Sequence, residues 1–394
     1  MKAVYYQNPG EEEKLLYKPG LGFPLEEPVL TREVGTAGSL QFRIYEEHEA
    51  YTKIHPLSTY FMVREGDEEI FRGRNIGSEE NFYRMGDIIC EGDLNFLCDS
   101  IMRPYTHTGS IEEFMEKLLE SHNGQVEERK QFRLGIVTVK DSNDRISRSD
   151  SGYTKSLEVL KDKLVDTHGG YLRTRKTDGI YYLDYIEDYG EENRQKIRFG
   201  ENLLDLTKYV EPSQIITALI PNGSEIEKNG EKSLLGIGEV NEGADYIFNE
   251  QAVQKYGWIF GQKTWKDVTK ADNLLKKARE YLDTAAGLPV TMQLKAVDLI
   301  HTGADIQSFQ VGYWTEVVSE INGVNGWYML TKIENNLADP EADVIVLGGS
   351  IDTLTSGNLD NKKMTDKKLS QAVKEKTETS IRLLTKEELF EILI

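Results

Sequence analysis

The sequence predicts an α+β protein with several domains. Its 394 residues are enough for two to four domains of ordinary size. Two regions, at about 29–100 and 289–350, consist of short segments in which apolar and polar residues alternate, as in β-strands with one buried face. The segments between them change to the spacing of amphipathic helices. We therefore expect two β regions separated by mixed α and β segments.

The first β region follows an extended N-terminal stretch. Residues 1–28 contain four of the ten prolines, a composition that favours extended chain and turns. The segment "GSLQFRIY" places its apolar residues on one face of a strand. "STYFMVREGDEEIFRGRNI" predicts a hairpin with residues 65–67 at its tip, and "DIICEG" predicts a further strand.

The segment "SIEEFMEKLLESHNGQ" predicts a helix with a signal at each end. Ser110 and Glu113 form a capping box at its start. Asn123 and Gly124 are expected to adopt the left-handed conformation that ends many helices. His122 lies in the last turn, where the helix dipole favours a partly protonated imidazole. We therefore interpret His122 as part of a helix end and not as a catalytic residue.

A second α/β stretch repeats this ending. The strand-like segment "QFRLGIVTVKD" changes phase after Gly135, which suggests a bulge. The helix in "TKSLEVLKDKLVDTHGGY" ends at His168, followed by two glycines that can take positive φ. Strands "YLRTR" and "IYYLDY" are joined through an Asp-Gly turn, which predicts a hairpin. The tyrosines here are expected to form cross-strand pairs, with a protein or sugar interface as the alternative.

The rest of the chain returns to strands and then to helices. Residues 196–248 are predicted to form short strands separated by Gly and Asn turns, and 249–282 contain helical patterns. After Pro289 the pattern is β again. The last 30 residues are predicted to be helical, with a second capping box from Thr385 to Glu388.

The charge balance argues against some classes of partner. With 47 basic and 67 acidic residues the formal net charge is −20, which would repel phosphate groups over most of the surface. We expect neither specific nucleic-acid binding nor attachment to an anionic membrane. The lysine-rich stretch 362–379 is interpreted as a solvated helix face. Without a long apolar run or a secretory signal, the chain is expected to have no membrane anchor and to be made in the cytoplasm.

The sequence contains no strong enzymatic signature, such as HExxH, GxSxG or a phosphate-binding glycine loop. Cys90 and Cys98 are expected to be buried apolar residues. The histidines lie singly, without metal-ligand spacing, and they are His48, His55, His107, His122, His168 and His301. No catalytic, cofactor-binding or metal-ligating residue is predicted, and no cofactor. A catalytic pair assembled only by folding, or two carboxylates placed for glycoside hydrolysis, are the alternatives.

Ten weak motifs occur in the order seen in one protein family. They are "GTAGSLQFRIYEEHEAYTKIHPL", "EEIFRGRNI", "IICEGDLNFLCDS", "PYTHTGSIEEFMEKLLESHN", "RLGIVTVKDSN", "THGGYLRTR", "IYYLDYIEDYG", "QKIRFGENLLDL", "IITALIPNG" and "VNEGADYI". Over residues 29–350 the chain thereby resembles the prophage tail endopeptidase family, or tail-associated lysins, of siphophages that infect Gram-positive bacteria. Within this family, the chain is similar to the tail proteins of Listeria prophages.

The resemblance implies a fold similar to the baseplate hub protein of contractile phages. Two β-barrel-like tail-tube modules would carry inserted or appended α/β modules, and three copies would form a ring that matches a hexameric tail tube. The implied parts are a first β module (1–104), a discontinuous α/β module (105–195 plus 249–285), a second β module (196–248 plus 286–350) and a C-terminal helical segment (351–394).

The resemblance also implies a function and partners. The chain would be a trimeric tail-tip hub in the virion, joining the tail tube to the host-adsorption apparatus and forming a channel for DNA exit. Its partners would be the distal tail protein, the tape measure protein and receptor-binding or baseplate proteins.

The family name also implies an endopeptidase. In longer members the lytic activity resembles a separate domain after the hub, whereas here about 45 residues follow the last β module, too few for a hydrolase core. We therefore expect a structural protein and not an enzyme. A tail-associated peptidoglycan hydrolase is the alternative, and a carbohydrate-binding adsorption protein, suggested by the tyrosine content, is a third possibility.

Overall fold

The structure is a computed structural model that describes residues 2–22, 24–80, 84–141, 145–210, 215–228, 231–266, 268–286, 290–302 and 307–348. All of these residues belong to one compact unit, Met1–Ile351. The predicted C-terminal helix, with its capping box from Thr385 to Glu388, lies outside the described residues.

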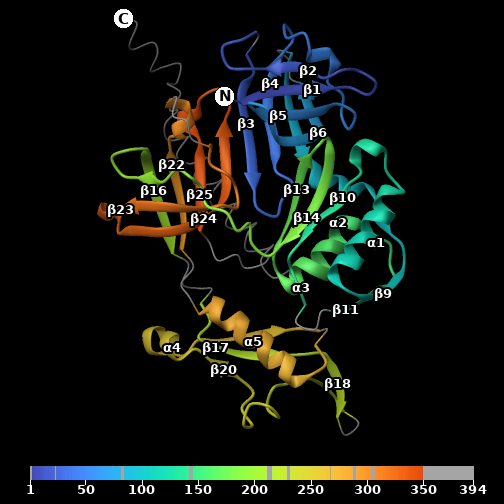
Figure 1. The fold of residues 1–394 in the computed structure, drawn as a ribbon, viewed down its shortest axis with the longest axis vertical. Helices are drawn as coiled ribbons and strands as arrows, with labels where there is room; N and C mark the ends of the chain where they lie inside the picture. Colours follow the sequence, from blue (N-terminus) through green and yellow to red (C-terminus); the bar gives the residue numbers. More distant parts are fainter. Residues whose placement is uncertain are drawn as a thin grey trace, which may run out of the picture. The chain divides into compact units, whose positions relative to one another are not determined.

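Both β regions contribute strands to one large sheet (Figure 1). In the described part of the chain this sheet has 13 strands, all paired antiparallel except β15 with β23. The first region, together with the N-terminal stretch before it, supplies β1 (Lys2–Gln7), β2 (Lys14–Tyr17), β3 (Glu26–Glu33), β4 (Ser39–Tyr45), β5 (Tyr60–Glu65), β6 (Glu68–Glu80) and β7 (Met85–Gly92). The second region, together with residues 197–210, supplies β15 (Ile197–Arg198), β16 (Leu203–Val210), β22 (Val290–Ala296), β23 (Trp314–Ser319), β24 (Val324–Asn336) and β25 (Val344–Gly348).

The two regions meet where β24 pairs with β3. Five antiparallel residue pairs, from Lys332 opposite Glu33 to Asn336 opposite Val29, form this junction. On either side the side chains pack into separate apolar cores. The first contains Leu40, Phe42, Ile44 and Phe61, and the second contains Met292, Leu294, Ile345 and Leu347. The large sheet is therefore continuous in its backbone pairing, while each region buries its own apolar face.

The segment between the regions begins with an α/β part. Its elements are β8 (Ile101–Met102), β9 (Tyr105–Gly109), α1 (Ile111–Asn123), β10 (Arg133–Val137), β11 (Ile146–Asp150), β12 (Thr154–Lys155), α2 (Ser156–Leu160), a π-helical turn (Lys161–Val165), α3 (Asp166–His168), β13 (Tyr171–Thr177) and β14 (Ile180–Ile186). β10, β14 and β13 form a three-stranded sheet. α1 and α2 pack their apolar residues into one core with this sheet, including Phe114, Leu118, Leu160 and Leu183.

Several local predictions are confirmed in this part. Ser110 and Glu113 form the capping box in both directions. The pairing of β10 with β14 is irregular between Leu134 and Val137, where the bulge was expected. The turn between β13 and β14 has φ of 52° at Asp178 and 77° at Gly179, the conformation that the Asp-Gly signal predicts.

The predicted left-handed end of α1 is wrong. Gly124 has φ −72° and ψ −7°, an ordinary right-handed conformation, and Asn123 belongs to the last turn of the helix. The Asn123 side chain instead donates to the carbonyl oxygen of Phe132 at 2.8 Å and accepts from its N–H at 3.1 Å. Asn123 therefore fixes the returning chain against the helix, and no left-handed residue is needed.

Residues 215–286 fold around a small sheet of their own, here called the 215–286 body. Its elements are β17 (Ala218–Asn222), β18 (Glu225–Lys228), β19 (Glu231–Leu234), β20 (Ile247–Phe248), α4 (Glu250–Tyr256), β21 (Phe260–Thr264) and α5 (Ala271–Ala285). β17 lies between β20 and β21, and α5 crosses this sheet in Figure 1. Leu274, Ala278 and Leu282 of α5 are buried, as the helical spacing predicts.

The described chain is thus mostly antiparallel β, with its longer helices in the α/β part and in the 215–286 body. The interpretation of each β region as a β-barrel-like module stays a prediction, as do the boundaries of the four expected parts. Strands β17 and β20, expected within the second β module, pair with each other, and β17 also pairs with β21.

Candidate functional site

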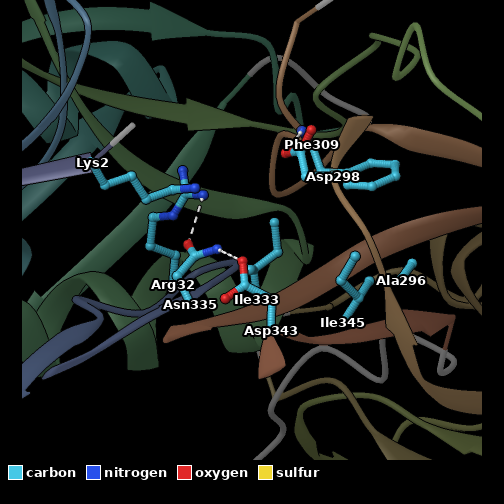
Figure 2. Close-up of a pocket in the computed structure, with 9 residues that line it drawn as sticks. All are labelled: Lys2, Arg32, Ala296, Asp298, Phe309, Ile333, Asn335, Asp343 and Ile345. Atoms are coloured by element: carbon cyan, nitrogen blue, oxygen red, sulfur yellow. Dashed lines mark hydrogen bonds between the residues drawn. The ribbon is translucent and has the colours of Figure 1, made fainter. Parts of the chain in front are cut away.

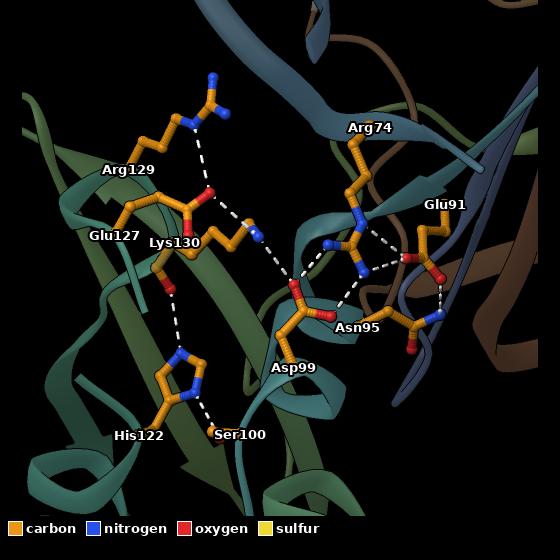
Figure 3. Close-up of polar contacts among 9 residues, drawn as sticks. All are labelled: Arg74, Glu91, Asn95, Asp99, Ser100, His122, Glu127, Arg129 and Lys130. Carbon is orange, nitrogen blue, oxygen red and sulfur yellow. Dashed lines mark hydrogen bonds and ion pairs between the residues drawn. The ribbon is translucent and has the colours of Figure 1, made fainter. Parts of the chain in front are cut away.

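His122 lies in a chain of hydrogen bonds inside the α/β part (Figure 3). Its Nδ1 atom is 2.7 Å from Ser100 Oγ, and its Nε2 atom is 3.0 Å from the carbonyl oxygen of Lys130. Ser100 Oγ is in turn 2.6 Å from Ser156 Oγ. Because a carbonyl oxygen can only accept, we assign the proton to Nε2, and Nδ1 then accepts from the Ser100 hydroxyl. The network therefore fixes the orientation of the ring and, for a neutral imidazole, selects the Nε2–H tautomer.

This serine and histidine pair has the connectivity of a hydrolase dyad, but it is closed to solvent. Ser100 is 1% exposed, and His122 and Ser156 are 0% exposed. Burial lowers the pKa of His122, against the raising effect of its bond to the Lys130 carbonyl. Burial at the end of α1 thus acts against the protonation that the helix dipole was predicted to favour. In this structure the pair connects α1, α2 and the 127–132 segment.

An ion-pair network beside His122 holds the segment that follows α1 (Figure 3). Arg74 contacts both Glu91 and Asp99, and Lys130 Nζ is 2.9 Å from Asp99 Oδ2. Burial raises the pKa of Asp99, but the hydrogen bonds from Arg74 and Lys130 outweigh it and hold this pKa below its ordinary value. Lys130, whose carbonyl oxygen accepts from His122, is thus itself held in place by Asp99.

His168 has a different set of partners. Its Nε2 atom is 3.3 Å from Asp141 Oδ2, and its Nδ1 atom is 3.3 Å from the carbonyl oxygen of Leu164. Lys277 of α5 lies 3.6 Å from the same carboxylate oxygen. Burial, followed by the charges of Lys277 and Arg148, lowers the pKa of His168 against the opposing effect of Asp141. His168 therefore sits in a charged cluster that includes a residue of the 215–286 body.

The other histidines, which lie singly in the sequence, have separate surroundings. His48 is buried, with Nε2 3.0 Å from the carbonyl oxygen of Leu16, while His55 is exposed. His107 contacts the carbonyl oxygen of Ser110, and the side chain of His301 lies outside the described residues. Among the described residues, no group of three or more His, Cys, Asp or Glu side chains could hold a metal ion.

The cysteine prediction is correct for one residue only. Cys90 is buried and Cys98 is half-buried. Burial raises the pKa of both thiols. A raised pKa leaves less of the nucleophilic thiolate at neutral pH.

The tyrosines of the β13–β14 hairpin do form cross-strand pairs, and two of the four lie opposite cationic residues. Tyr182 lies opposite Arg175, with the guanidinium carbon 4.7 Å from the ring centre. Tyr181 lies opposite Lys176, whose Nζ is 5.1 Å from the ring centre. Cation–π contacts of this kind stabilise the hairpin and leave few of its tyrosines for a ligand.

A buried polar cluster lies at the junction of the two β regions (Figure 2). Arg32 Nη2 donates to Asn335 Oδ1 at 3.2 Å, and Asn335 Nδ2 donates to Asp343 Oδ2 at 2.6 Å. Burial raises the pKa of Asp343 to about 6. The cavity lined by these side chains and by Lys2 and Asp298 has a volume of about 10 Å³. It is large enough for about one water molecule, so this cluster is a structural junction and not a ligand site.

A larger cleft of about 200 Å³ is lined by residues of β3, β6 and β13. Four of its five cationic side chains are engaged in ion pairs, including Arg72 with Asp93 and Lys176 with Glu69, while the fifth, Arg32, donates to Asn335. Arg173 and Arg175 both pair with the buried carboxylate of Asp184. The cleft therefore holds a compensated charge network.

None of the described helices is long and apolar enough to cross a membrane.

Comparisons with known proteins show similarity to phage tail proteins. Residues 191–358 match the family model described as prophage endopeptidase tail, which confirms the predicted resemblance in that part of the chain. No curated protein sequence matches.

Solved structures extend the similarity of fold to most of the chain. Prophage tail protein gp18 from Listeria monocytogenes EGD-e has 14% identity and a TM-score of 0.60, covering 91% of this chain and 98% of that one. The 43 kDa tail protein of prophage MuSo2 from Shewanella oneidensis has 12% identity and a TM-score of 0.60, covering 88% and 98%. A tail protein from Neisseria meningitidis has 12% identity and a TM-score of 0.57, covering 90% and 98%.

Proposed function

We propose that the chain is a structural protein of a phage tail, a trimeric hub at the distal end of the tail tube. The observation that carries this proposal is the similarity of fold to prophage tail proteins, which extends over about nine tenths of both chains. Proteins that share a fold can differ in function, so the proposal needs the further support that follows.

The arrangement of the two β regions supports a trimer. A trimer can match a sixfold tube if each chain supplies two similar units, and here two β regions lie side by side in one sheet. The described path of this sheet runs from β16 to β2, and such outer strands have unpaired backbone groups that can pair with another chain. We propose that 1–104 and 196–248 plus 286–350 are the tube-like modules, and that 105–195 plus 249–285 is the α/β module.

The proposed position implies partners and a channel. The hub would contact the distal tail protein, the tape measure protein and receptor-binding or baseplate proteins, and would assemble in the host cytoplasm before becoming part of the virion. The net charge of −20 suits a channel for DNA exit, because acidic side chains on its wall would repel phosphate groups. No specific nucleic-acid binding is proposed.

The stoichiometry of the chain in assembled tails tests the proposal. We expect native mass spectrometry of the full chain with the distal tail protein to show three copies of this chain, and cryo-electron microscopy of tails to place them at the tip. One, two or six copies at the tip, or density elsewhere along the tail, would contradict the hub. A neutral or basic channel wall would remove the acidic-channel idea alone.

A second candidate, a peptidoglycan hydrolase, is favoured by the description of the matching family. We propose that this chain is not an enzyme. Among the described contacts, one serine and histidine pair is connected as in a hydrolase, and that pair is closed to solvent. A zymogram with host cell walls tests this, and we expect no clearing by the folded chain. Clearing by the wild-type chain that persists at constant specific activity through purification would contradict it.

A further inference from the structure

Four aromatic side chains gather on one side of the 215–286 body. We call Tyr246, Phe248, Trp258 and Phe260 the aromatic face. Phe248 is 50% exposed, and Trp258 and Phe260 are each 53% exposed. Their rings nevertheless contact one another: Phe248 and Trp258 have centroids 5.1 Å apart, and Trp258 and Phe260 are stacked at 5.8 Å with an angle of 15°. Large apolar side chains thus cluster in contact with water.

The strand register explains why two of these rings, Phe248 and Phe260, share a side. Ala218 of β17 lies opposite Phe248 of β20 and opposite Phe260 of β21. Residues directly opposite on neighbouring strands point to the same face, so the two rings flank a small alanine. The next residue of β21, Gly261, faces the other way. A Cβ there would lie 2.5 Å from Ile216 Cδ1.

The opposite face of the same sheet is already covered. Leu219 and Ile247 alternate with the aromatic positions and pack in one core with Leu274 and Leu282 of α5. The aromatic face therefore adds nothing to the core of this body. Exposed apolar clusters of this kind mark binding surfaces.

Neutral polar side chains continue the face along the strands. Gln262 and Thr264 follow Phe260 at alternate positions of β21 and are exposed. Asn222 of β17 lies opposite Thr264. The strand positions of this face thus pass from aromatic rings to amide and hydroxyl groups, with no ionisable side chain among Ala218, Ile220, Asn222, Phe248, Phe260, Gln262 and Thr264.

The size of the aromatic face favours a small ligand. An aromatic side chain covers about 150–250 Å², so three rings that are about half exposed offer roughly 300 Å². A standard protein interface needs about 800 Å² from each partner. The lack of charge at the strand positions gives no attraction to an acidic or basic ligand.

We propose that the aromatic face binds a neutral oligosaccharide. A pyranose ring has an apolar face of C–H groups, which can stack on the electron-rich face of an aromatic ring, and hydroxyl groups at its edge. Trp258 and Phe260, stacked within 15° of parallel, supply the aromatic surface. Gln262, Thr264 and Asn222 supply hydrogen-bonding groups to orient the hydroxyls. This inference does not rest on the trimer or on the position at the tail tip.

Calorimetric titration of the full chain with tetrasaccharides tests the proposal. The probes are the tetramer of N-acetylglucosamine, cellotetraose and maltotetraose, and we expect at least one to bind. Trp258→Ala and Phe260→Ala should each weaken that binding about tenfold or more by removing a stacking ring. The matched control is Trp327→Ala, because Trp327 on β24 is 46% exposed and lies outside the aromatic face. It should bind as the wild type does.

Two results would overturn the proposal. One is the absence of heat and of any tryptophan fluorescence change with all three sugars at millimolar concentration. The other is equal weakening by Trp258→Ala and Trp327→Ala. Native mass measured on the same samples separates the two proposals: loss of sugar binding with an unchanged copy number leaves the hub standing. A wild type that binds no sugar, with a copy number altered by Trp258→Ala, would assign the face to a protein contact instead.

Discussion

Two helices in the α/β part end in a histidine followed by residues that favour turns, yet the structure ends them differently. After His122 the chain stays right-handed, with φ −72° at Gly124, and the Gln125 N–H donates to the His122 carbonyl at 2.9 Å. After His168 both Gly169 and Gly170 have φ of 76°. The same short pattern therefore gives two backbone geometries, because tertiary contacts decide which one forms.

The surroundings of Gly124 and Gly170 differ in how closely other atoms approach. Gly170 lies so close to β14 that a Cβ would be 2.7 Å from the carbonyl oxygen of Ile186 and 2.6 Å from Val139 Cγ2. At Gly124 the nearest atom to a Cβ would be the Glu120 carbonyl oxygen, at 3.4 Å. Close packing thus requires glycine at the second helix end and only tolerates it at the first.

The largest expected effect is the difference between two glycine substitutions. Gly170→Ala should destabilise the fold by about 3 kcal/mol, because it adds a steric clash to a left-handed backbone. Gly124→Ala should be neutral or stabilising by up to about 1 kcal/mol, because its φ suits alanine. Urea unfolding of both variants, with far-ultraviolet circular dichroism as control for folding, measures the difference. Equal destabilisation would contradict the comparison.

The next effect compares the histidine side chains. His122→Ala should cost about 3 kcal/mol, because it leaves a cavity and removes the partner of the buried Ser100 hydroxyl and Lys130 carbonyl. His168→Ala should cost less, about 2 kcal/mol, because its bonds are longer and Asp141 keeps Lys277 nearby.

Urea unfolding of the two variants measures this difference, with His48→Ala as a further buried histidine for reference. If His168→Ala is the more damaging change, the charged cluster stabilises the fold more than the neutral network does. That result would reverse the ranking.

Local sequence signals predicted much of the fold. The capping box at Ser110 and the Asp-Gly turn at 178–179 involve residues within a few positions of one another, so their physical cause is present in the sequence. The end of α1 could not be predicted in this way. Asn123 bonds to Phe132, and that choice depends on where the following segment packs.

Long-range pairings were beyond the same reasoning. The alternation in β3 and β24 predicts two strands, but nothing in either segment indicates that Leu30 will lie opposite Asn335. The aromatic face was missed for the same reason. Its four rings come from positions 246 to 260. The pairing of β17 with β20 and β21 brings Phe248 and Phe260 to one side, and ring contacts join Tyr246 and Trp258 to them. A signal was present in the sequence: Phe248 and Phe260 are large apolar residues in short strands that lack apolar alternation, and such residues could have been considered as exposed.

The smallest effect concerns the pKa values of the two histidines. Burial lowers both pKa values, so each imidazole binds its proton more readily when the chain is unfolded. The contribution of each histidine to stability is therefore complete at pH values above the ordinary histidine pKa of about 6.5. It is lost as the pH falls below that value and through the lowered pKa of the folded chain. The charge of Lys277 contributes to the lowering only at His168.

Lys277→Met should therefore raise the pKa of His168 towards its ordinary value and leave that of His122 unchanged, an effect worth less than about 1 kcal/mol. Nuclear magnetic resonance titration of the imidazole Cε1–H signals measures both values in one sample. Lys276→Met is the control, because it removes a neighbouring charge of α5 that is not among the influences on His168. Equal movement of both histidines would show that Lys277 acts through general stability and not through the charged cluster.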